Sequence, residues 1–139
     1  MYKVIDFCNL FFYCTLIYWL SNQESLPTPH WFSFEDKLHH TAAYAVMAFL
    51  AWRSFRHRIN NKPIILALVT LGFCSLYGVS DEWHQSFVVG RYSSVGDWIA
   101  DTLGAAIACV ALLKYSSFSK KICSLSKLMI FAALMQSFL

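Results

Sequence analysis

The sequence predicts an all-α membrane protein, a bundle of four transmembrane helices with both termini on the cytoplasmic side. Three observations support this class. Hydrophobic residues make up 58% of the 139-residue chain, which leaves too little polar surface to cover a soluble domain of this size. The apolar residues gather in four separate segments, each near the lower end of the ~17–25 residues that span a bilayer. The connections between these segments also differ in charge from one to the next.

The four apolar segments are about Val4–Leu20, Leu38–Trp52, Ile64–Val79 and Trp98–Tyr115. Every backbone polar group in lipid needs an internal partner, so each segment is expected to be a helix. The second segment is short unless its polar start, "EDKLHH", belongs to the same helix, and nothing in "EDKLHHTAAYAVMAFLAW" breaks one. A fifth apolar patch, Leu128–Leu139, is expected to be either an interfacial helix or a short span.

The segments define one four-helix transmembrane domain over residues 1–115, followed by a basic tail with a short apolar segment over residues 116–139. Lys3 and the apolar run after it resemble the start of a signal peptide. However, Asp6 interrupts that run and no small-residue cleavage site follows Leu20, so a mature transmembrane helix is expected.

The cysteines have no metal-like spacing and are expected to be free thiols; they are Cys8, Cys14, Cys74, Cys109 and Cys123.

The distribution of basic residues predicts the orientation. Residues 53–62 hold three arginines and a lysine, and four lysines lie at the end of the fourth segment and beyond it, Lys114, Lys120, Lys121 and Lys127. Residues 21–37 carry one lysine against three acids, and residues 80–97 carry one arginine. The positive-inside rule then places the N-terminus, the 53–62 connection and the C-terminal tail in the cytoplasm. The net charge of +3 is small and no long basic block is present, so nucleic acid is not an expected partner.

This orientation brings polar groups from distant parts of the chain to one level, at the outer face of the membrane. The start of the second helix, the end of the third and the start of the fourth all lie there. The groups at this level are Asp36, His39, His40, Asp81, Glu82, Gln85, Arg91, Asp97 and Asp101.

Helical spacing assigns several of these groups to shared faces. Asp36, His39 or His40, and Tyr44 can line one face of the second helix. Asp81 and Gln85 fall together on the third helix, and Asp97 and Asp101 lie one turn apart on the fourth. Below them Ala100, Gly104 and Ala108 form a row of small residues that lets another helix approach closely.

A structural role and a functional role both fit part of this set. Asp36 and Asp97 lie at helix N-termini, where the helix dipole favours acids, and Ser94 with Asp97 fits a capping box. Asp81 and Glu82 lie near a helix C-terminus, where the dipole disfavours anions. Asp101 lies inside a span, where an ionised carboxylate is costly without a partner.

The excess of acids over bases makes a divalent cation a plausible cofactor. Arg91 is the expected counter-charge, and its planar guanidinium suits a carboxylate or a lipid phosphate. If Arg91 neutralises one acid, three or four remain. Carboxylates with waters suit Mg²⁺ or Ca²⁺, and an added histidine suits Zn²⁺ or Mn²⁺. The candidate metal ligands are His40, Glu82, Asp97 and Asp101.

The stretches "DKLHHTAAYAVMAFL" and "YGVSDEWHQSFVVGRYSSVGDWIADTLGA" resemble the VanZ-like family of small bacterial membrane proteins. The family pattern is a D-K-x-x-H-x-x-x-Y helix, an E-x-x-Q pair, a G-R element and a D-x-x-x-[ND]-x-x-G helix, and the resemblance covers residues 35–110. It falls on Asp36, Lys37, His40, Tyr44, Glu82, Gln85, Gly90, Arg91, Asp97, Asp101 and Gly104. The family often has Asn at the position of Asp101, and its register prefers His40 over His39.

The name-giving member of this family is linked to teicoplanin resistance, and no general reaction of the family carries over to this chain. The resemblance implies a multi-pass protein of the bacterial plasma membrane that acts near the outer face of the envelope. It does not imply that this chain confers antibiotic resistance.

Two functions from different classes fit these residues, and a third reading is structural. In the first, the outer pocket binds a lipid or a lipid-linked envelope precursor by its anionic headgroup. Its binding residues are then Asp36, Tyr44, Gln85, Arg91 and Asp101. In the second, the protein is an enzyme acting on a lipid-linked phosphate or sugar, with Glu82 or Asp97 as general base and His40 as acid or ligand. In the third, the polar cluster only locks the helices together.

Overall fold

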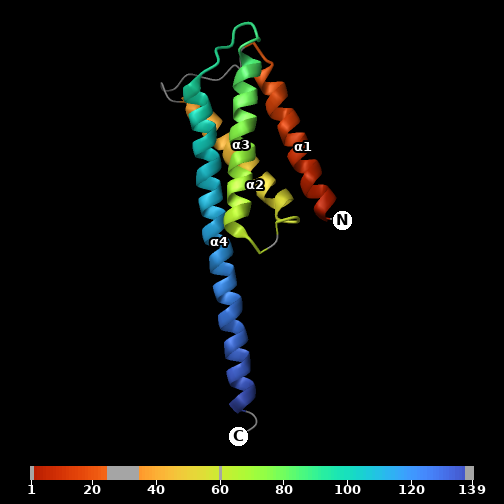
Figure 1. Cartoon of the computed structure of the whole chain (residues 1–139), viewed down its shortest axis with the longest axis vertical. Coiled ribbons are helices and arrows are strands. Elements are labelled where there is room, and N and C mark those ends of the chain that lie inside the picture. The colour runs from red at the N-terminus through yellow and green to blue at the C-terminus, as the bar shows by residue number, and fades with distance from the viewer. Residues whose placement is uncertain (1, 25–34, 60, 137–139) are drawn as a thin grey trace.

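The described part of the chain folds into a bundle of four helices. The computed structural model describes residues 2–24, 35–59 and 61–136, with side chains as far as residue 118. The helices are α1 (Tyr2–Ser21), α2 (Glu35–Phe55), α3 (Pro63–Gln85) and α4 (Val95–Gln136) (Figure 1). These described segments contain no strand, so the predicted all-α class is confirmed.

The helix boundaries follow from local sequence chemistry. α2 begins at Glu35, so the polar "EDKLHH" stretch does belong to the helix, as predicted. α3 begins with Pro63, and a proline is tolerated in the first turn because its missing N–H would have no helical partner there. α4 begins after Ser94, whose Oγ accepts a hydrogen bond from the N–H of Gly96 at 3.1 Å. That bond satisfies one of the free donors at the start of the helix.

The C-terminal segment differs from the prediction. A separate interfacial helix or short span was expected over Leu128–Leu139, but α4 continues without a break through Gln136. No proline or glycine follows Gly104, so nothing in the sequence stops the helix. At 42 residues, α4 is about 63 Å long, roughly twice the hydrocarbon thickness of a bilayer. Its second half extends past the other three helices (Figure 1).

α4 is the helix on which the bundle is organised. It packs along both α2 and α3, whereas α1 packs mainly against α2. The contact between α2 and α4 is close enough that a Cβ on Gly104 would collide with the backbone of Thr41. Small side chains make this possible elsewhere as well, since Ala48 and Ala51 of α2 and Ala105 of α4 are completely buried. The predicted row of small residues therefore serves helix packing.

The outer surface of the bundle is apolar, as a membrane protein requires. Large hydrophobic side chains such as Phe12, Leu68 and Leu76 are more than half exposed. Among the described residues three helical stretches are long and apolar enough to cross a membrane, Tyr2–Ser21, Pro63–Gln85 and Val95–Phe118. α2 is not among them; its first turn is polar, with Glu35, Asp36 and Lys37, and Arg53 lies in its last turn.

Candidate functional site

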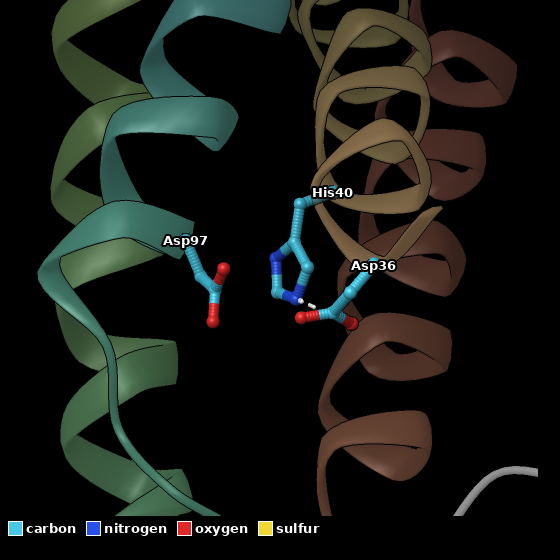
Figure 2. A group of neighbouring side chains, drawn as sticks. All are labelled: Asp36, His40 and Asp97. Carbon is cyan, nitrogen blue, oxygen red and sulfur yellow. Dashed lines mark ion pairs between the residues drawn. The ribbon is translucent and has the colours of Figure 1, made fainter. Parts of the chain in front are cut away.

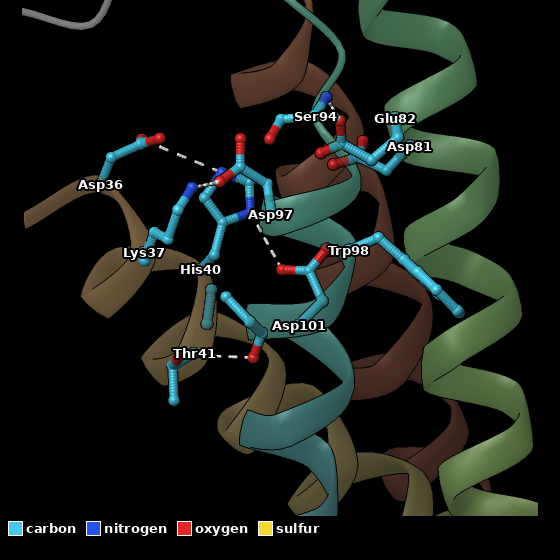
Figure 3. A network of polar contacts seen from close by, with 12 residues as sticks. Asp36, Lys37, His40, Thr41, Asp81, Glu82, Ser94, Asp97, Trp98 and Asp101 are labelled. Carbon is cyan, nitrogen blue, oxygen red and sulfur yellow. Dashed lines mark hydrogen bonds and ion pairs between the residues drawn. The ribbon is translucent and has the colours of Figure 1, made fainter. Parts of the chain in front are cut away.

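Three helices place ionisable side chains at one end of the bundle. α2 contributes Asp36, Lys37 and His40 from its first two turns. α3 contributes Asp81, Glu82 and Gln85 from its last two turns, which the structure shows to be helical. α4 contributes Asp97 and Asp101 from its first two turns. Because α2 and α4 both begin at this end and α3 ends there, residues far apart in sequence meet (Figure 3).

Two contacts join the first turns of α2 and α4. The ammonium of Lys37 lies 2.5 Å from Oδ1 of Asp97, which is 7% exposed. One turn further, Thr41 Oγ1 donates a hydrogen bond to the carbonyl oxygen of Ala100 at 3.2 Å. These bonds lock the two helices in register.

His40 is held between the two helices by a buried acid. Its Nδ1 lies 2.9 Å from Oδ1 of Asp101, a completely buried carboxylate. Its Nε2 faces the other way, 4.0 Å from Oδ1 of Asp36 (Figure 2). The imidazole of His40 and the carboxylate of Asp101 therefore pair inside the bundle, while Asp36, whose side chain is 67% exposed, lies at its mouth. His39, by contrast, is exposed.

The acids of α3 are buried and only partly satisfied. Gln85 Nε2 donates to Oδ2 of Asp81 at 3.1 Å. Oε2 of Glu82 accepts the backbone N–H of Ser94 at 2.7 Å, which ties the start of α4 to the end of α3. Oε1 of Glu82 has no hydrogen-bond partner among the described residues, although Glu82 is only 6% exposed.

Two further buried oxygens in this region also lack a partner within the described part of the chain. They are the hydroxyl of Tyr44 and Oδ2 of Asp101. The latter lies beside Gly78, where a Cβ would come within 3.1 Å of it. Buried polar groups in folded proteins are nearly always paired with protein groups or water, so these oxygens have hydrogen-bonding capacity that the described residues do not use. Tyr44, unlike Asp101, lines an adjacent cavity.

That cavity has a volume of about 330 Å³ and lies between α1, α2 and α3. Its apolar lining comes from Ile17 and Leu20 of α1 and Ala43 of α2. The polar lining consists of Ser21, Glu24, Asp36, His39, His40, Tyr44, Asp81, Gln85 and Arg91.

Arg91 lines the cavity but is held by backbone groups. Its Nε donates to the carbonyl of Gln23 and its Nη2 to the carbonyl of Leu20, both at 3.0 Å. These bonds satisfy carbonyls left free at the end of α1. An ion pair between Arg91 and an acid was expected, and none occurs among the described residues. The preceding Gly90 has a φ of 81°, a backbone conformation that favours glycine, so the turn that presents Arg91 depends on it.

The opposite end of the bundle holds a second polar cluster that the sequence analysis did not identify. Asp6 of α1 is 5% exposed, and its carboxylate is paired with Arg53 at 2.7 Å and with His57 at 2.7 Å. Ser54 donates to the backbone carbonyl of Asp6 at 2.9 Å. A lone acid within an apolar span needs a partner. The sequence signal for the partners of Asp6 was the pair Arg53 and His57, which lie one helical turn apart.

The four cysteines whose side chains are described, Cys8, Cys14, Cys74 and Cys109, are free thiols, as predicted. Cys123 lies outside the described side chains.

Comparison with known proteins gives one match. The sequence model of the family described as VanZ/LLP1 matches residues 4–119, which include every helix that lines the cavity. No curated protein and no solved structure matches the chain.

Proposed function

The chain belongs to the VanZ/LLP1 family, and from this premise we propose that it binds a lipid headgroup at the outer face of the bacterial plasma membrane. All four helices cross the membrane in this proposal, with the N- and C-termini inside. The ligand is a lipid or a lipid-linked envelope precursor whose headgroup carries a phosphate. The headgroup occupies the cavity between α1, α2 and α3.

The charge of the two ends of the bundle supports this orientation. The connection between α2 and α3 carries Arg56, Arg58 and Lys62, and the opposite end carries four buried acids, Asp81, Glu82, Asp97 and Asp101. Basic connections remain in the cytoplasm because of the positive-inside rule. In this arrangement the cavity opens at the outer membrane–water interface, the level at which lipid headgroups lie.

The observation that carries the proposal is the mixed lining of the cavity. The apolar side chains of Ile17 and Leu20 suit the upper part of a lipid chain, and the polar lining residues suit a headgroup. The buried hydroxyl of Tyr44 has no hydrogen-bond partner in the described residues, so it is available to a ligand.

The surplus of acids constrains the ligand. Asp36 and Asp81 line the cavity together with Glu24, against Arg91 and two histidines. A bare phosphate would be repelled by these carboxylates. A headgroup with donor groups, such as sugar hydroxyls or amines, can place those donors on the acids and its phosphate against Arg91.

Two tyrosine substitutions separate ligand binding from helix locking. Tyr44→Phe removes a hydroxyl that has no partner, whereas Tyr77→Phe removes a hydroxyl that donates to the carbonyl of Cys14 at 2.6 Å. Each variant is purified in mild detergent, its co-extracted lipids are quantified by mass spectrometry, and its unfolding temperature is measured. We expect Tyr44→Phe to retain several-fold less phosphate-bearing lipid with unchanged or higher stability, because an unsatisfied buried group is removed.

Tyr77→Phe is expected to show the opposite pattern, with lower stability and full lipid retention. If both variants retain lipid as the wild type does, the cavity does not bind a headgroup.

One observation favours a second candidate, an enzyme acting on a lipid-linked phosphate or sugar. The bond between His40 and Asp101 fixes the orientation of an imidazole, and a carboxylate oxygen of Glu82 lies within 4.8 Å of a ligand atom of each of them. Such a set can move a proton. Incubating the purified protein with a lipid-linked sugar phosphate tests this candidate. Release of phosphate or sugar that is abolished by His40→Gln would establish an enzyme, whereas an unchanged lipid supports binding alone.

A further inference from the structure

We propose that His40, Glu82 and Asp101 form a binding site for one divalent transition-metal ion, Mn²⁺ or Zn²⁺. The inference deepens the proposed function and rests on it, because His40 also lines the headgroup cavity and the ion would lie directly beside that cavity. The ion would supply the positive charge that a phosphate needs among so many acids.

The geometry of the three side chains fits a shared ion. One ligand atom from each of His40, Glu82 and Asp101 lies within 4.8 Å of the others. Nδ1 of His40 and Oδ1 of Asp101 are 2.9 Å apart. Adjacent ligands on an octahedral ion with bonds of about 2.1 Å are about 3 Å apart, so this spacing also suits two ligands of one ion.

An unpaired buried oxygen points independently to a missing cation. Glu82 is 6% exposed and Asp101 is completely buried, so neither carboxylate is satisfied by bulk water. Oε1 of Glu82 has no hydrogen-bond donor among the side chains and backbone groups that are described. Leaving a buried acceptor unpaired costs about 1–3 kcal/mol, and more for a charged one. A metal ion removes that cost by binding the oxygen directly.

A second triad nearby is a weaker site. Asp36, His40 and Asp97 also bring ligand atoms within 4.8 Å of one another (Figure 2). However, Asp97 is already paired with Lys37, and the side chain of Asp36 is largely exposed. An ion there would compete with an ammonium group and with water. The triad of His40, Glu82 and Asp101 has neither competitor.

The donor set indicates the kind of metal. Mg²⁺ and Ca²⁺ prefer oxygen ligands alone, whereas one imidazole with two carboxylates suits Mn²⁺ or Zn²⁺. The buried position leaves further coordination places for water or for a ligand phosphate.

The test uses the purified full-length protein, stripped of metal with a chelator, and the metal alone as the probe. Binding of Mn²⁺ is followed by electron paramagnetic resonance, and Zn²⁺ is then added as a competitor. We expect one Mn²⁺ per chain that Zn²⁺ displaces. Glu82→Gln and Asp101→Asn should each weaken Mn²⁺ binding at least tenfold, and the matched control Asp36→Asn should leave it within twofold.

Two results would overturn the inference. One is the absence of saturable Mn²⁺ binding in the wild type, and the other is an equal loss in Asp36→Asn and Glu82→Gln. Both main variants replace a carboxylate by an amide of the same shape, which limits their effect on folding. If Glu82→Gln does not fold, Mn²⁺ binding by a folded Asp101→Asn still tests the inference. Lipid retention by the Tyr44→Phe variant is measured separately, without metal, so a failed metal site and a failed headgroup site give different results.

Discussion

The buried carboxylates of this protein fall into two kinds according to their partners. Each carboxylate oxygen of Asp6 has a side-chain partner, Arg53 on Oδ1 and His57 on Oδ2, and Ser54 donates a hydrogen bond to its backbone carbonyl. Glu82 and Asp101 each keep one oxygen without a partner in the described chain. A carboxylate whose pairs are complete serves stability, whereas one with an open oxygen is poised for a ligand.

Removing Arg53 should therefore reduce stability. Arg53→Met removes the guanidinium from Asp6 and leaves it the imidazole of His57, and Asp6 is 5% exposed. The expected loss is about 1–3 kcal/mol in the free energy of unfolding, because a buried charge loses a partner. Thermal unfolding in detergent measures it, with Arg56→Met as control, since Arg56 is exposed on the same stretch. Equal unfolding temperatures for the two variants would show that Asp6 does not depend on Arg53.

The helices themselves were largely predictable because each apolar segment is bounded by charges. The polar start of α2 could be assigned from the lack of any helix breaker after Glu35. The end of α4 could not be predicted, because the apolar patch Leu128–Leu139 follows a basic stretch, and that pattern fits either a new helix or a continuation of α4. The backbone continues through that stretch as one helix, and no turn residue interrupts it.

The contact between α2 and α4 depends on the absence of a side chain at Gly104. Gly104→Ala should weaken or separate this pair, because its Cβ would meet the backbone of Thr41, which cannot rotate away. We expect a strongly lowered yield of folded protein and a fall in unfolding temperature. Gly72→Ala is the matched control, since a Cβ on that residue of α3 meets nothing within 4 Å.

Size-exclusion chromatography of the solubilised variants measures the yield of folded protein, and thermal unfolding measures its stability. Gly72→Ala should elute as the wild type does and be slightly more stable, because alanine favours helix more than glycine. A Gly104→Ala variant that elutes and unfolds like the wild type would contradict the close packing of α2 on α4.

At the scale of the whole molecule, the membrane orientation made part of the site predictable, whereas the rotation of each helix could not be predicted. The sequence places His40, Glu82 and Asp101 at one membrane level once the orientation is inferred. It cannot show which oxygens remain unpaired, because that depends on the rotation of each helix. For the same reason the role of Arg91 was not foreseen: its guanidinium binds the carbonyls of Leu20 and Gln23.

The orientation predicts which connections a membrane-impermeant reagent reaches. Ser93 precedes α4 and Lys62 precedes α3, and both are exposed. In a chain whose natural cysteines are replaced by alanine, Ser93→Cys should react with an impermeant maleimide in intact cells. Lys62→Cys should react only after the cells are permeabilised. Labelling of both positions from the same side would contradict the four-span topology.

Photo-crosslinking from the cavity wall in living cells tests most directly whether the cavity holds a lipid headgroup. A photoreactive phenylalanine replaces Leu20, which lines the cavity, or Leu16, which is exposed one turn earlier on α1. Mass spectrometry then identifies the adducts. The account predicts that position 20 captures a phosphate-bearing lipid that position 16 does not, and that Tyr44→Phe reduces this adduct. The same bulk phospholipids at both positions, unaffected by Tyr44→Phe, would contradict it.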